Sequence, residues 1–174
     1  VDLKQTNAVG FVGLRMFLYG MLKNITIDLS TRQYFQDVRL FYILDAEYQK
    51  EFEWLRCLPH VQNEDLTQRN IVCDSDSKNI LFEYLYKELN RRSTEGEEFQ
   101  TILTVFVYND QGLKRHPISR FIDRAAELGV CFLFFEEYAD FLPNNCDTVI
   151  ELRDGQNGKV VQARDALKEC EFYY

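Results

Sequence analysis

Short apolar runs of strand length alternate along this chain with segments of helical periodicity, and this alternation constrains the fold more than any other feature. The strand-length runs are Val9–Val12, Val38–Leu44, Asn70–Cys73, Ile102–Tyr108 and Val130–Phe135. Most of them are apolar at consecutive positions, which is typical of strands buried on both faces of a sheet. The alternation therefore predicts an α/β domain of three layers, with helices on both faces of a mostly parallel sheet.

Three segments between these runs are predicted helices. The first begins after Gly13, the second spans Ile80–Leu89 behind three N-cap candidates at 74–76, and the third is Pro117–Leu128. The third has proline in its first turn and glycine just past its end, which is the usual asymmetry of helix termini. The final segment, Asp147–Gln162, alternates apolar and polar residues around a Gly/Asn turn and predicts a hairpin at the sheet edge.

Length and charge limit the organisation and the partners. A chain of 174 residues fits a single domain over 1–174, and its net charge of -8 argues against a general nucleic-acid or anionic-membrane surface. No apolar run reaches the roughly 20 residues of a membrane span. Because the sequence begins at Val1 without Met, we expect a piece of a longer chain, with any membrane anchor outside it.

The cysteines indicate a reducing, cytoplasmic-type compartment. They form an odd set with no C-x-x-C pair: Cys57, Cys73, Cys131, Cys146 and Cys170. Cys57 and His60 have C-x-x-H spacing, but no second pair follows at the spacing of a zinc site, so we expect packing and no bound metal.

The stretch V-G-F-V-G-L-R-M-F, which begins at Val9, reads as a strand that breaks at glycine into a helix. Many α/β proteins cradle phosphate at such a turn, using G-x-x-x-x-G-K-[ST]. Here Leu14, Arg15 and Met16 follow Gly13, so the lysine for the phosphates and the hydroxyl for Mg²⁺ are missing. The turn predicts a phosphate-loop geometry without its chemistry, and Arg15 is expected to be solvated or ion-paired.

Carboxylates follow several predicted strands: Asp45, Asp74, Asp110, Glu136 and Glu137. Such groups are ordinary N-caps and turn residues, but gathered at one edge they could hold Mg²⁺. One alternative function is therefore a Mg-dependent phosphotransfer or receiver-like domain that uses Asp45 and Asp110, with Lys114 or Arg115 as charge partner.

A family resemblance becomes visible at F-E-W-L-R-C-L-P-H-V, Phe52–Val61. It resembles the W-E-W-L-R-W-L-P-H element of the first, degenerate ATPase-like domain of the FtsK/SpoIIIE-type motor in type VII secretion, the EssC/YukB family of Firmicutes. The segments V-G-F-V-G, E-L-N-R-R, T-V-F-V-Y-N-D, A-A-E-L-G-V-C-F-L-F-F and L-P-N-N-C-D-T-V-I-E-L agree in order, from about Asn7 to Val161. The sequence departs from the family at Cys57 and Asn109.

The resemblance implies a RecA/P-loop-like fold and a pseudo-ATPase that needs no cofactor. It implies a vestigial nucleotide pocket at Gly10, Gly13, Leu14, Arg15 and Asp110. Phe132–Leu142 resembles a Walker B strand with its acidic pair, but the strand before Asp110 is the better match by chain order. The implied role is a non-catalytic module on the cytoplasmic side of the bacterial plasma membrane, which contacts neighbouring ATPase domains and membrane segments of its parent chain. Because its neighbours would close a ring and its own surface is mostly charged, we expect the isolated domain to be a monomer.

Two surfaces remain as hypotheses for how such a module makes contacts. Trp54, Leu55, Leu58, Pro59 and His60 form a candidate interaction surface, because tryptophan is prominent among binding hot spots, although core packing of these residues is the alternative. A groove that reads secreted helical-hairpin substrates is a further hypothesis.

Overall fold

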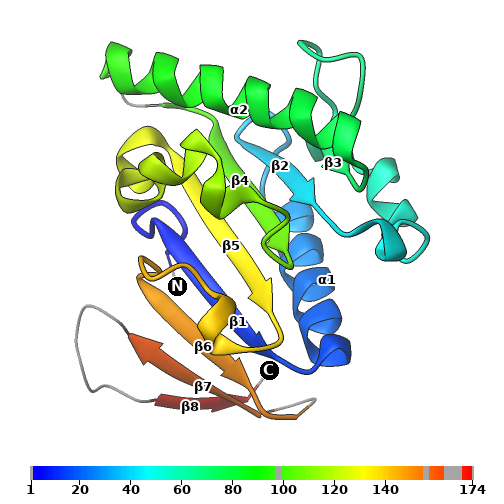
Figure 1. Cartoon of the computed structure of the whole chain (residues 1–174), viewed down its shortest axis with the longest axis vertical. Coiled ribbons are helices and arrows are strands. Elements are labelled where there is room, and N and C mark those ends of the chain that lie inside the picture. Colours follow the sequence, from blue (N-terminus) through cyan, green and yellow to red (C-terminus); the bar gives the residue numbers. More distant parts are fainter. Residues whose placement is uncertain (1, 97–98, 155–156, 163–169, 174) are drawn as a thin grey trace.

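Figure 1 shows a computed structural model of the chain, which describes residues 2–96, 99–154, 157–162 and 170–173. Its strands are β1 (Ala8–Gly13), β2 (Val38–Ile43), β3 (Ile71–Val72), β4 (Ile102–Tyr108), β5 (Val130–Glu136), β6 (Thr148–Leu152), β7 (Asn157–Gln162) and β8 (Cys170–Tyr173). The helices are α1 (Arg15–Arg32) and α2 (Ser75–Glu95). Short 3₁₀ segments are η1 (Ala46–Tyr48), η2 (Glu53–Cys57), η3 (Pro59–Val61), η4 (Leu113–Arg115), η5 (Pro117–Arg124), η6 (Ala126–Leu128) and η7 (Ala139–Phe141).

The strands of the described chain form one sheet in the order β3-β2-β4-β5-β1-β6-β7-β8. Every pairing from β3 to β6 is parallel, and β6–β7 and β7–β8 are antiparallel. The predicted mostly parallel sheet is therefore confirmed. Since β3 to β6 run in one direction, their carboxyl ends lie along one edge, and β5 lies between β1 and β4 there.

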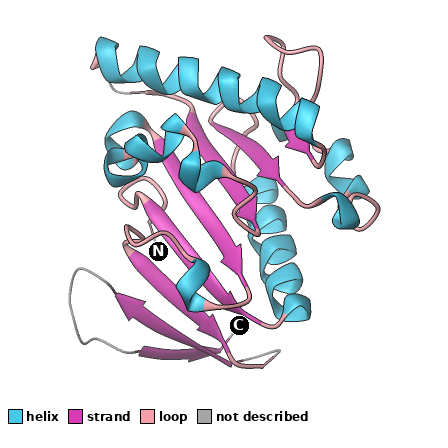
Figure 2. Ribbon diagram, in the orientation of Figure 1, coloured by secondary structure: helices cyan, strands magenta, loops and turns pink. Residues whose placement is uncertain are grey.

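Helices cover both faces of this sheet, which confirms the three-layer prediction (Figure 2). On one face, Leu18 and Leu22 of α1 are fully buried in a cluster with strand residues such as Leu133. On the other face, Leu81 of α2 and Ile118 of η5 are fully buried in a second cluster. Alternate residues of each strand belong to one cluster or the other, because successive side chains of a strand point to opposite faces of the sheet.

The ends of α2 follow from local chemistry. The Asp74 carboxylate accepts hydrogen bonds from the backbone N–H groups of Asp76 (3.1 Å) and Ser77 (2.9 Å), and so caps the helix as predicted. The helix ends at Gly96, whose φ of 63° is a left-handed conformation that glycine adopts without strain.

Two predicted elements differ from the structure. The segment Pro117–Leu128 is not an α-helix but the 3₁₀ segments η5 and η6, followed by Gly129 at φ 65°. The hairpin exists as β6 and β7, but it is not the edge of the sheet, because β8 pairs with β7 beyond it. The turn at 155–156 lies outside the described residues.

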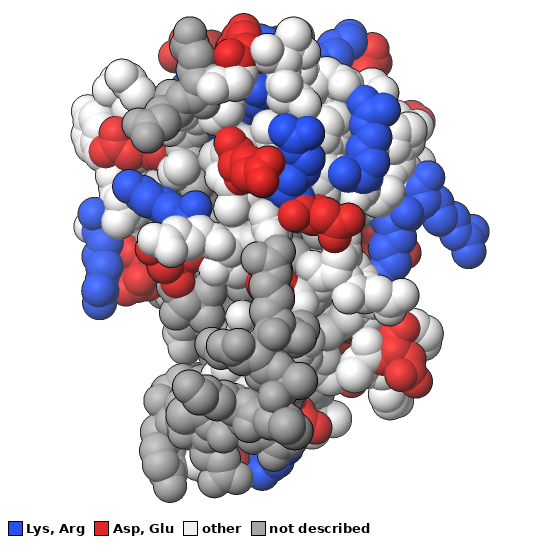
Figure 3. All heavy atoms as spheres, turned by 90° about the vertical axis from the view of Figure 1, so that its left-hand side faces the viewer, with Lys and Arg blue, Asp and Glu red and all other residues white. Residues whose placement is uncertain are grey.

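Among the described helices, none combines the length and apolar character that crossing a membrane requires. On the face shown in Figure 3, basic and acidic side chains lie interspersed.

Candidate functional site

The turn after β1 is a single residue long. β1 ends at Gly13 and α1 begins at Arg15, so a single residue, Leu14, connects them. Leu14 is the N-cap of α1, makes no side-chain cap bond and is 64% exposed. A phosphate loop places four residues between its two glycines before the lysine. The turn therefore lacks the four-residue loop and the lysine of that motif.

Both glycines of the proposed vestigial pocket lie close to neighbouring residues, Gly13 against backbone and Gly10 against a side chain. A Cβ at Gly10 would lie 2.5 Å from Cδ1 of Leu142, and a Cβ at Gly13 would lie 2.7 Å from the carbonyl oxygen of Leu152. Neither glycine is among those of the described chain with positive φ. The small size of Gly13 lets β1 approach the backbone of β6 closely.

Arg15 is ion-paired, as expected. Its guanidinium forms a salt bridge with Glu47, lies 3.9 Å from a carboxylate oxygen of Glu137, and stacks 4.6 Å from the centre of the Tyr48 ring. These neighbours raise the pKa of Arg15. The charge of Arg15 is thus directed at carboxylates of its own chain.

Carboxylates do gather at the carboxyl ends of β4 and β5. A pocket of about 330 Å³ there, which we call the acidic pocket, is lined by Asn109, Asp110, Lys114, Glu136, Glu137, Tyr138 and Phe141. Glu136 is 4% exposed. Burial raises its pKa to about 7, while Lys114 and a hydrogen bond from the Asp110 backbone act in the opposite direction.

The loop that forms one wall of this pocket has an unusual backbone. Asn109, Asp110 and Gln111 have φ values of 60°, 47° and 43°, and Gly112 follows at 85°. Three consecutive non-glycine residues in the left-handed region are strained, and such strain often occurs at functional sites. The Asp110 carboxylate accepts a hydrogen bond from the Lys114 backbone N–H (3.1 Å), which closes the turn.

Asp45 and Asp110 follow the carboxyl ends of the neighbouring strands β2 and β4, but they take part in different contacts. Asp45 caps η1 and accepts a hydrogen bond from the Gln111 side chain (3.4 Å), whereas Asp110 lines the acidic pocket with Lys114. Within the described residues, no group of three or more His, Cys, Asp or Glu side chains is arranged to hold a metal ion.

The candidate interaction surface around Trp54 is partly buried, and its role in binding stays a prediction. Leu55 and His60 are buried, and His60 Nε2 donates to the Gln33 carbonyl oxygen (3.0 Å). Trp54 and Leu58 pack half-buried against the same core cluster, which leaves Pro59 exposed. The segment forms η2 and η3, whose apolar side chains cover the sheet.

Sequence reasoning missed a different apolar surface. Leu14 (64% exposed) and Met16 (70%) lie at the start of α1, and Tyr138 (63%) and Phe141 (56%) follow β5. Glu137 lies between the two pairs, because it lines both the acidic pocket and a neighbouring hollow formed by Leu14 and Met16. In the sequence, the signal for this surface was the two aromatic residues, Tyr138 and Phe141, that follow the Glu136–Glu137 pair.

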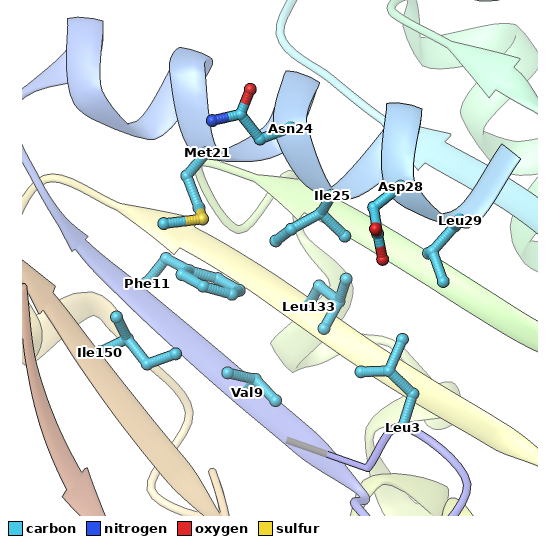
Figure 4. Close-up of a pocket in the computed structure, with 10 residues that line it drawn as sticks. All are labelled: Leu3, Val9, Phe11, Met21, Asn24, Ile25, Asp28, Leu29, Leu133 and Ile150. Atoms are coloured by element: carbon cyan, nitrogen blue, oxygen red, sulfur yellow. The ribbon is translucent and has the colours of Figure 1, made fainter. Parts of the chain in front are cut away.

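A second hollow lies beside α1 on the sheet face. Figure 4 shows the side chains that line this groove of about 350 Å³: Leu3, Val9, Phe11, Met21, Asn24, Ile25, Asp28, Leu29, Leu133 and Ile150. Most of these are apolar, with polar atoms supplied by Asn24 and Asp28 on the helix. The groove is suited to an apolar segment bordered by a few polar contacts.

Comparison with known proteins relates this architecture to secretion ATPases. No family model matches the chain. It is 23% identical over 159 residues (88% of this chain) to the ESX secretion system protein EccC of Geobacillus thermodenitrificans. It is 23% identical over 174 residues (94%) to the type VII secretion system protein EssC of Staphylococcus aureus. The chain spans 11% and 12% of the lengths of these two relatives.

Solved structures show the same fold. EssC (ATPases 2 and 3) from Geobacillus thermodenitrificans matches with a TM-score of 0.71 and 13% identity, over 98% of this chain and 39% of that one. Thermomonospora curvata EccC (ATPases 2 and 3), in complex with a signal sequence peptide, matches with a TM-score of 0.71 and 12% identity, over 99% of this chain and 37% of that one. The chain thus has the α/β fold of a secretion ATPase domain. It is homologous to a segment of EssC and EccC, as the resemblance had indicated.

Proposed function

We propose that the chain is a non-catalytic, ATPase-like module of a type VII secretion motor, which acts through contacts with other domains. Homology to EssC and EccC supports the setting. The observation that carries the non-catalytic role is the one-residue turn at Leu14, which replaces a phosphate loop.

Electrostatics at the carboxyl edge also oppose triphosphate binding. Phosphoryl transfer depends on positioned cations and donors. Here Arg15 is paired with Glu47, and Asp110, Glu136 and Glu137 line the adjacent pocket. A helix N-terminus alone contributes about 0.3–1 kcal/mol toward an exposed anion, which does not offset the desolvation of a triphosphate.

The proposed setting is the cytoplasmic side of the bacterial plasma membrane, within a longer membrane-anchored protein. Related structures are described as cytoplasmic domains of EccC and EssC. The partners would be neighbouring ATPase domains and membrane segments of the same chain, and the isolated domain would be a monomer. The resemblance assigns it to the first ATPase-like position.

Phosphate release with Mg·ATP tests the non-catalytic role. We expect no turnover above the buffer rate, in the wild type and in Asp110→Asn alike. Turnover that Asp110→Asn abolishes would contradict the proposal, because it would show a working site at the end of β4.

The groove beside α1 supports a second candidate function, binding an apolar segment of a secretion substrate. It is lined mostly by apolar side chains, and the Thermomonospora curvata relative was solved with a signal sequence peptide. Titration with a signal-sequence peptide tests this role. Ile25→Ser in the groove should weaken binding, whereas Ile27→Ser, which is exposed and does not line the groove, should not. Equal effects of the two variants would count against the groove.

A further inference from the structure

The acidic pocket contains a buried acceptor that the fold leaves unused. Glu136 is 4% exposed, lines the pocket, and its Oε1 atom has no hydrogen-bond partner in the described chain. An unpaired buried acceptor costs about 1–3 kcal/mol. A ligand that donates to this carboxylate would recover that cost.

The charge balance of the pocket favours a cation. Asp110, Glu136 and Glu137 contribute carboxylates, and Lys114 is the basic residue of its lining. Within the described chain, Lys114 lies in no ion pair shorter than 4.0 Å. Arg15 approaches Glu137 only to 3.9 Å and is bound more closely to Glu47. The carboxylates therefore exceed the internal cations that face them.

The residues that line the acidic pocket favour binding of an organic cation over a metal ion. The described side chains offer no group of three metal ligands, and a volume of about 330 Å³ far exceeds one ion. Tyr138 and Phe141 line the pocket, are largely exposed and stand edge to face with ring centres 5.9 Å apart. Aromatic faces beside carboxylates suit a guanidinium, which stacks on rings and donates in a planar fork.

The surface on the other side of Glu137 indicates what flanks such a cation. Leu14 and Met16 are exposed there, and large exposed apolar side chains around a polar centre are typical of protein interfaces. A partner that matches both features would present an arginine flanked by apolar residues.

We propose that the acidic pocket binds an arginine side chain of a partner protein, with apolar residues of the same segment on Leu14 and Met16. The carboxyl edge of the sheet, where folds of this class bind ligands, would thus accept a cation in this chain. The inference deepens the contact role proposed above and rests on it, but it predicts binding of a cation and not merely the loss of ATP binding.

Nuclear magnetic resonance titration of the 174-residue chain tests the proposal, using a leucine-arginine-leucine peptide blocked at both ends. The matched probe is the same peptide with citrulline, which keeps the shape and loses the charge. We expect shifts at Glu136, Tyr138 and Phe141, and binding about tenfold tighter for arginine than for citrulline. Binding should tighten from pH 6 to pH 8 as Glu136 ionises, with Asp110, Glu137 and Lys114 as its charged neighbours.

The variants separate the pocket from general acidity. Glu136→Gln and, independently, Glu137→Gln should each weaken arginine binding severalfold, whereas Glu64→Gln, at an exposed residue that does not line the pocket, should not. Equal binding of the two peptides, or no effect of either pocket variant, would overturn the proposal. So would saturable shifts at Glu136 with Mg²⁺ alone, which would make the pocket a metal site. The ATP measurements are independent of all these outcomes.

Discussion

The buried guanidinium of Arg92 connects the end of α2 to the start of β5. It is 4% exposed and donates to the carbonyl oxygens of Leu128 (2.9 Å), Gly129 (3.2 Å) and Thr101 (3.1 Å), and to the Glu88 carboxylate (2.8 Å). A buried charge with its donors satisfied holds its surroundings in place, and its removal leaves those acceptors unpaired.

Arg92→Ala should therefore lower the free energy of unfolding by about 3 kcal/mol. Arg91→Ala is the matched control, because Arg91 forms half-exposed pairs with Glu88 and Glu95 and such pairs contribute about 0–1 kcal/mol. Urea denaturation of the two variants measures the difference. Equal losses would show that the contacts of Arg92 do not carry its stabilising role.

Glu136 makes stability depend on pH in an unusual direction. Its pKa is about 7 in the folded chain, and an unfolded glutamate has a pKa of about 4.3, so the folded state binds more protons between these values. Stability contributed by this group is then lost as the pH rises from about 4.3 to about 7.

Glu136→Gln should thus be more stable than the wild type at pH 8, by about 2 kcal/mol, and should lose most of that advantage at pH 4.5. The check is urea denaturation of both proteins at the two pH values. A difference that is independent of pH would contradict the assigned burial of the carboxylate.

At the scale of elements, the glycines of β1 and α1 have opposite roles. Gly13 faces the carbonyl oxygen of Leu152 at the β1–β6 pairing, whereas nothing lies within 4 Å of a Cβ at Gly20 inside α1. Gly13→Ala should destabilise the domain by about 1–3 kcal/mol, because backbone must move. Gly20→Ala should stabilise it by about 0.5–1 kcal/mol through helix propensity. Thermal unfolding measures both changes, and a Gly13→Ala variant that is as stable as the wild type, or more stable, would refute the packing role of Gly13.

The strands and long helices could be predicted because their signals are local: continuous apolar runs, the Asp74 cap and the terminal glycines. The 3₁₀ form of η5 and η6 was harder to predict from the sequence. The buried residues Ile122, Ala125 and Leu128 recur every three positions, which suits three residues per turn, but Ile118 and Phe121 also fit an α-helix. The tertiary contacts of η5 and η6 decide between the 3₁₀ and the α-helical form. The four-residue β8 has too little pattern to be distinguished from a loop.

The site was predicted in part for the same reason. The absence of a lysine after Gly13 can be read directly from the sequence. The burial of Leu55 and His60, by contrast, depends on how η2 and η3 fold onto the sheet. The unpaired Oε1 of Glu136 likewise arises only when β4 and β5 lie side by side.

For the whole molecule, the sheet order gathers the ends of six parallel strands along one edge. In this fold that edge is where ligands bind. This chain places there a one-residue turn, an ion-paired Arg15, an acidic pocket and exposed apolar side chains. The chain has the fold of a secretion ATPase domain, and this edge carries carboxylates and exposed apolar side chains.

Calorimetric titration of the chain with Mg·ATP tests the central claim most directly, with Arg15→Ala as the paired variant. Because Arg15 is the cation at the β1–α1 turn and is bound to Glu47, the account predicts no heat beyond dilution for either protein at millimolar ATP. Micromolar binding by the wild type that Arg15→Ala abolishes would contradict the account, and would show that the turn at Leu14 still recognises a triphosphate.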